Sequence, residues 1–140
     1  MPKVQADGLP LPQRYGAILT IVIGISMAVL DGAIANVALP TIATDLHATP
    51  ASSIWVVNAY QIAIVISLLS FSFLGDMFGY RRIYKCGLVV FLLSSLFCAL
   101  SDSLQMLTLA RVIQGFGGAA LMSVNTALIR LIYPQRFLGR

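Results

Sequence analysis

The chain has 140 residues, of which 59% are hydrophobic and only 10% are charged, and its mean hydropathy is +0.90. Soluble domains carry about 25% charged residues, so a water-soluble fold is excluded and the lipid bilayer is the expected solvent. The net charge of +4 comes from single bases at the ends of apolar segments, whereas nucleic-acid binding needs a basic face or stripe. We therefore expect no nucleic-acid partner. No metal-ligand cluster, nucleophile–base set or phosphate loop stands out, so no metal, no cofactor and no enzymatic activity are expected.

In chain order, residues 1–14 form a short polar tail, which we expect on the cytoplasmic side. Pro40 is expected to end the first helix, and residues 41–53 to form an external loop. Residues 134–140 begin a cytoplasmic loop. The sequence predicts an all-α membrane protein with four transmembrane helices, each long enough for a hydrocarbon core about 30 Å thick. These helices span about 15–39, 54–74, 83–100 and 104–133.

The Lys and Arg residues indicate the orientation of the four spans. Of the nine bases, eight lie in the segments predicted to be inside or near the inner ends of the spans, and the two predicted outer loops hold none. Because short loops rich in Lys and Arg stay in the cytoplasm, the N-terminus and residue 140 are both predicted to be cytoplasmic.

The densest cluster of charge lies between the second and third spans. Gly75 and Gly79 are expected to turn the chain there, since glycine takes positive φ at little cost. Asp76 opens this turn, and Arg81 and Arg82 follow it. The pattern predicts a short cytoplasmic hairpin.

Two ionisable residues lie well inside the spans, where a charge costs several kcal/mol unless it faces protein or a watery cavity. Asp31 lies eight residues before the outer end of the first span, and Arg111 lies eight residues after the outer turn at Ser103. Both are therefore about 12 Å below the outer surface, and Gln61 lies in the same layer. We expect a shared polar site, which Asn58 and Gln114 could extend. The alternative is an ion pair that only holds the helices together.

Small residues form a further pattern, which is typical of close helix packing. Gly24, Ala28 and Gly32 belong to a series on the first span in which small residues recur every four positions, and Gly115 and Gly118 lie on the fourth span. Packing is the expected role of these five residues, and helix flexing is the alternative.

Three segments then point to a family. Residues 74–82 resemble the motif between helices two and three of the major facilitator superfamily, and residues 104–119 resemble its helix-four motif. Residues 30–40 look like the helix-one signature of the drug:proton antiporter group with fourteen helices. Trp55 and Tyr60 match the usual start of that group's second helix.

This resemblance implies proton-driven export by alternating access from the bacterial inner membrane. It implies that Asp31 is the membrane-embedded acid for protons or cationic substrate and that Arg111 serves proton coupling. It assigns the cytoplasmic gate to the hairpin, with Gly75, Asp76, Gly79, Arg81 and Arg82. The implied partners are the lipid bilayer, protons and small lipophilic, cationic substrates.

The family's six-helix halves consist of two inverted triplets of helices. We therefore interpret the chain as part of the N-terminal six-helix bundle of a longer transporter, whose remaining polypeptide is a further partner. Two alternatives stay open. One is a stand-alone four-helix multidrug exporter that works as a dimer, and the other is a membrane scaffold that transports nothing.

Overall fold

The computed structural model describes residues 11–132, except for the side chains of residues 11, 126 and 129–132. Within this range the chain forms four helices and no strand. They are α1 (Leu11–Asp45), α2 (Pro50–Phe78), α3 (Tyr80–Ala99) and α4 (Leu104–Ile132). All four are long and apolar enough to cross a membrane, which confirms the all-α membrane fold. The expectations for residues 1–10 and 133–140 lie outside the described residues.

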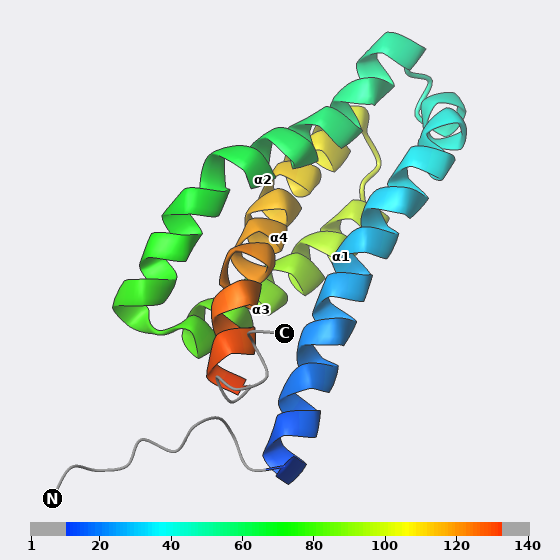
Figure 1. Cartoon of the computed structure of the whole chain (residues 1–140). Helices are drawn as coiled ribbons and strands as arrows, with labels where there is room; N and C mark the ends of the chain where they lie inside the picture. Colours follow the sequence, from blue (N-terminus) through cyan, green and yellow to red (C-terminus); the bar gives the residue numbers. More distant parts are fainter. Residues whose placement is uncertain (1–10, 133–140) are drawn as a thin grey trace, which may run out of the picture.

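Helix α4 is the centre of the bundle (Figure 1). It packs mainly against α2 and α3, and α1 makes fewer contacts with the other helices. Of the most apolar 18-residue stretch of each helix, 61% is buried in α4, against 17% in α1 and 22% in each of α2 and α3. Large apolar side chains such as Val37, Val65 and Leu69 stay exposed on the outer faces. Such faces suit lipid or further helices rather than water.

Two glycines of α4 let neighbouring backbones touch it directly. A Cβ atom on Gly117 would lie 2.7 Å from the backbone nitrogen of Phe91 in α3. A Cβ atom on Gly115 would lie 2.7 Å from the backbone oxygen of Tyr60 in α2. No larger residue fits at these positions without moving a helix. Helices α2 and α3 therefore pack closely against α4 on two sides.

The first helix is longer than expected, because Pro40 does not end it. Proline removes one helical hydrogen bond and its ring crowds the carbonyl of the residue four before it, but transmembrane helices tolerate proline when nearby groups satisfy the backbone. The helix continues past Pro40 to Asp45, and in its last turn Thr44 Oγ1 donates to the carbonyl oxygens of Pro40 and Thr41, at 2.9 Å each. The outer connection is therefore residues 46–49, not 41–53. Helix α2 then begins at Pro50, with Thr49 as its N-cap.

The hairpin between α2 and α3 turns at a single residue. Gly79 has φ 93°, a value that favours glycine. Gly75 does not share in the turn, contrary to expectation, because it lies inside α2 and is buried. A Cβ atom there would lie 2.8 Å from the ring of Tyr80 and 3.0 Å from the side chain of Val124. Gly75 thus admits close neighbours, and Gly79 turns the chain.

The small residues of α1 do not form one continuous contact surface. Gly24 and Ala28 are buried, and Tyr84 of α3 lies against Gly24 and donates a hydrogen bond to the Thr20 carbonyl oxygen at 2.8 Å. A Cβ atom on Gly32 would meet nothing within 4 Å, so the packing expected there is absent among the described residues. The reason is geometric: a four-residue step turns about 40° past a full turn, so Gly32 lies about 80° around the helix from Gly24.

Candidate functional site

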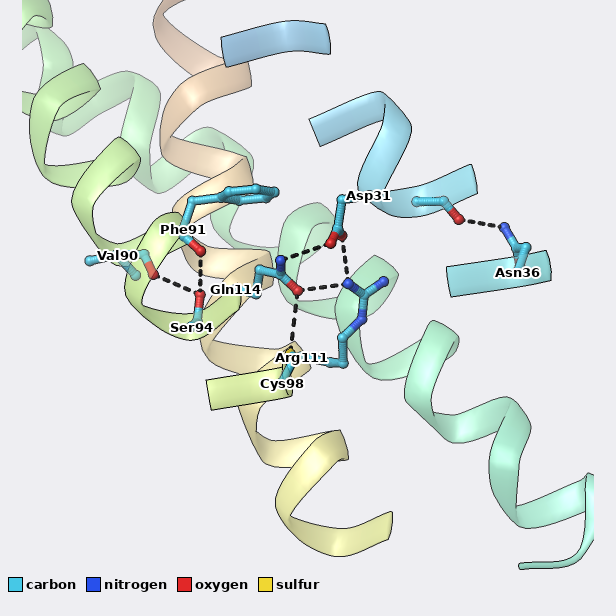
Figure 2. A network of polar contacts seen from close by, with 9 residues as sticks. Asp31, Asn36, Val90, Phe91, Ser94, Cys98, Arg111 and Gln114 are labelled. Atoms are coloured by element: carbon cyan, nitrogen blue, oxygen red, sulfur yellow. Dashed lines mark hydrogen bonds and ion pairs between the residues drawn. The ribbon is translucent and has the colours of Figure 1, made fainter. Parts of the chain in front are cut away.

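Three polar side chains form a closed network between α1 and α4 (Figure 2). Arg111 Nη1 donates to Asp31 Oδ2 at 2.5 Å and to Gln114 Oε1 at 2.6 Å. Gln114 Nε2 donates in turn to Asp31 Oδ1 at 3.0 Å. Each of the three residues therefore bonds both of the others.

The helices explain why these residues meet. Arg111 and Gln114 are three positions apart on α4, so they share one face. Asp31 projects from α1 at the level of Arg111, as expected, although α1 ends at Asp45 and not at Leu39, from which its depth was counted. From α3, Cys98 Sγ lies 3.7 Å from Gln114 Oε1. The guanidinium Cζ of Arg111 lies 4.5 Å from the ring centroid of Tyr60, which belongs to α2. All four helices thus contribute to the site.

The three residues of the network differ in how deeply their side chains are buried. Gln114 is 0% exposed and Arg111 is 4% exposed, whereas the Asp31 side chain is 21% exposed. A buried charge is tolerable only when it is paired and hydrogen-bonded, and Asp31 supplies that pairing for Arg111. Asp31 is thus the least buried of the three residues.

One edge of the Arg111 guanidinium lacks hydrogen bonds. Nε and Nη2 of Arg111 and the hydroxyl of Tyr60 are buried, and none of them has a hydrogen-bond partner among the described residues. The arginine is therefore held by hydrogen bonds through Nη1 and by the ring beneath it. Its position depends on few contacts.

Gln61 and Asn58 do not join this network, although their depth suggested that they would. Both side chains are exposed on α2. Counting residues along a helix fixes depth, but each residue also turns about 100° around the axis. The neighbouring Tyr60 faces the bundle instead. In the sequence Tyr60 stood out only through its match to the second helix of the antiporter group, which gave it no role in the site.

The hairpin residues lie apart from the network. Asp76 accepts a hydrogen bond from the Tyr80 hydroxyl, while Arg81 and Arg82 are exposed near Gly79. The two arginines therefore remain accessible at the end of the bundle where α2 and α3 join. Within residues 11–132, no group of three or more His, Cys, Asp or Glu residues is placed to hold a metal ion.

Comparison with known proteins gives one family. The family model described as Major Facilitator Superfamily matches residues 21–140. The chain is 33% identical over 130 residues to the riboflavin transporter RibZ of Clostridioides difficile, covering 93% of this chain and 28% of RibZ. It is 35% identical over 127 residues to the tetracenomycin C resistance and export protein of Streptomyces glaucescens, covering 91% of this chain and 23% of that protein.

A third relative is MdtD of Salmonella paratyphi B, which is provisionally named a multidrug resistance protein. The identity is 39% over 115 residues, covering 82% of this chain and 24% of MdtD. The chain thus spans about a quarter of the length of these relatives.

Proposed function

The chain belongs to the major facilitator superfamily, and on that premise we propose that it is the N-terminal portion of a proton-coupled multidrug antiporter. The observation that carries this proposal is the Asp31–Arg111–Gln114 network. It joins a partly exposed acid to a buried cation inside two apolar, membrane-length helices. Membrane-embedded ionisable residues of this kind mark ion and substrate pathways.

The arrangement supplies a coupling mechanism. While Asp31 is ionised, it pairs with Arg111 and fastens α1 to α4. A proton on Asp31 removes the negative charge, which weakens this attraction and frees α1 to move. A lipophilic cation that competes with Arg111 for the same carboxylate would have a similar effect. Protons and substrate would then use one acid in turn, as antiport requires, because each shifts the same equilibrium between two conformations.

The relatives support export. One is named for tetracenomycin C resistance and export, and another is provisionally named for multidrug resistance. We place the protein in the bacterial inner membrane with a cytoplasmic N-terminus, in the fourteen-helix group. In this proposal Gly75, Asp76, Gly79, Arg81 and Arg82 form the cytoplasmic gate, and the remaining helices of the transporter close the pathway. Family membership favours this proposal over a stand-alone four-helix exporter or a scaffold.

A specific observation favours a second candidate, which is a transporter of uncharged aromatic molecules. Asp31 is already neutralised by Arg111 at 2.5 Å, so the site as a whole carries little net charge. RibZ, with 33% identity, is named a riboflavin transporter. A substrate that offers hydrogen-bond acceptors and a flat ring would then suit the site better than a cation.

The test is efflux of a fluorescent lipophilic cation from energised cells that express the full-length protein and lack other exporters. Asp31→Asn is expected to reduce efflux to the rate of cells without the protein, because the acid can no longer change its charge. Asp102→Asn is the matched control, since Asp102 is an exposed acid in the connection between α3 and α4. Efflux that survives Asp31→Asn at normal protein level would refute the role of Asp31. Transport of riboflavin-like molecules with no transport of cations would favour the second candidate.

A further inference from the structure

The ring of Tyr60 lies against the guanidinium of Arg111. The guanidinium Cζ is 4.5 Å from the ring centroid, and both residues are 4% exposed. A cation at this distance over a ring face is attracted by the negative face of the ring, and the attraction grows when water is excluded. Tyr60 therefore offers Arg111 a second source of stabilisation besides Asp31.

One face of α4 is shaped to admit this tyrosine. Arg111, Gly115 and Gly118 are spaced by four and then three residues, which places them along a single side of the helix. A Cβ atom on Gly115 would lie 2.7 Å from the backbone oxygen of Tyr60. A Cβ atom on Gly118 would lie 3.1 Å from the Tyr60 hydroxyl oxygen. The two glycines thus accommodate the tyrosine from its backbone to its hydroxyl, beside Arg111.

The ring, rather than the hydroxyl, is the part of Tyr60 that interacts with the arginine. The hydroxyl is buried without a hydrogen-bond partner among the described residues, so it does not hold Arg111 in position through a hydrogen bond. The ring face carries a permanent negative potential. Unlike a carboxylate, this potential does not change when a proton binds.

We propose that Tyr60 is a positioning residue that holds Arg111 in place while the charge of Asp31 changes. This inference rests on the proposed function, in which Asp31 alternates between its charged and neutral forms. The titratable groups that face the site are Asp31 from α1, Tyr60 from α2, Cys98 from α3 and Arg111 itself. When Asp31 is neutral, the Tyr60 ring remains as an electrostatic partner that, together with the hydrogen bond to Gln114 Oε1, keeps the guanidinium in place.

The test replaces Tyr60 in the full-length protein by phenylalanine and by phenylalanines that carry one, two or three fluorine atoms. These side chains keep the shape of the ring while fluorine progressively weakens its negative face. The readout is the rate at which phenylglyoxal modifies Arg111 in the purified protein, measured by mass spectrometry of the peptide. Phe71 receives the same series as a control, since it is a partly buried aromatic residue of α2, about 16 Å further along the helix.

Tyr60→Phe is expected to react like the native protein, because the hydroxyl has no partner. The rate should then rise stepwise with each fluorine, by about 3- to 30-fold over the series, as the loss of a buried cation–π contact implies. In an Asp31→Asn background the rise should be steeper, because Arg111 has then lost its anionic partner and the ring supplies a larger share of the remaining stabilisation.

A rate that is independent of fluorine at position 60, or that responds equally at position 71, would overturn the proposal. A shallower rise in the Asp31→Asn background would overturn it as well. Labelling requires no transport, so these outcomes are separate from the efflux test. If Asp31→Asn leaves efflux intact while labelling follows the fluorine series, the proposed function fails and the placement of Arg111 by Tyr60 stands.

Discussion

At the scale of single residues, the molecule is defined by one ion pair in an apolar setting. Arg111 is 4% exposed and bonds Asp31 and Gln114 through a single nitrogen, Nη1. Removing one partner of such a pair leaves an uncompensated charge, which is more costly than losing both charges together.

We expect Asp31→Asn and Arg111→Gln each to destabilise the full-length protein by about 3–5 kcal/mol. The double variant should lose less than the sum of the two, because no buried charge is then left unpaired. The melting temperature of the protein in detergent measures this, with Asp102→Asn as the exposed control. Losses that simply add would show that Asp31 and Arg111 do not depend on each other.

The sequence allowed part of this site to be predicted. Counting residues from the predicted outer ends gave Asp31 and Arg111 the same depth, and Gln114 follows Arg111 by three residues. The count for Asp31 began at Leu39, whereas α1 continues to Asp45, so the agreement did not come from a correct helix end. Counting in the same way placed Gln61 in the layer, but its side chain is exposed on α2. Depth is a one-dimensional quantity, whereas contact also requires the angle around each helix. That angle depends on how helices pack, which is why Tyr60 was missed.

At the scale of helices, α1 is attached differently from the others. Glycines let α2 and α3 touch the backbone of α4, whereas α1 has fewer contacts. The polar contacts of α1 with other helices include the Asp31 network and the bond from the Tyr84 hydroxyl to the Thr20 carbonyl at 2.8 Å. Helix α1 is therefore the element that a change in charge at Asp31 can release most easily.

The second attachment can be tested at Gly24, where a Cβ atom would lie 2.1 Å from the Tyr84 hydroxyl oxygen. Gly24→Ala is expected to lower the melting temperature, because α1 must shift away from α3. Adding Tyr84→Phe should restore part of the loss by removing the clashing oxygen. Gly16→Ala is the control, since its Cβ would meet nothing within 4 Å. Equal melting temperatures for Gly24→Ala and Gly16→Ala would contradict the close contact between α1 and α3 at Gly24.

The existence of each helix was predictable from the sequence, and the ends were less so. Apolar length alone predicts four spans. The predictions for Pro40 and Gly75 were wrong because each residue was interpreted as a break, although transmembrane helices can tolerate a proline and a buried glycine can serve packing. Only the neighbours of a residue decide between these roles. At Gly75 those neighbours are Tyr80 and Val124, which come from other helices.

At the scale of the whole molecule, the bundle combines a packed centre with apolar outer faces. Helix α4 carries the buried half of the ion pair, and the more loosely attached α1 carries the acid. In the proposed mechanism, this division would let a local change of charge at Asp31 become a movement of α1 against the other three helices. The chain spans about a quarter of the length of its relatives.

The most direct measurement is proton movement in liposomes that contain the full-length protein and a pH-sensitive dye. Addition of a transported cation is expected to move protons in the opposite direction with the native protein. Asp31→Asn should move none, and Asp102→Asn should behave like the native protein. Substrate transport by the native protein without any proton movement would contradict the account, as would undiminished proton movement in Asp31→Asn.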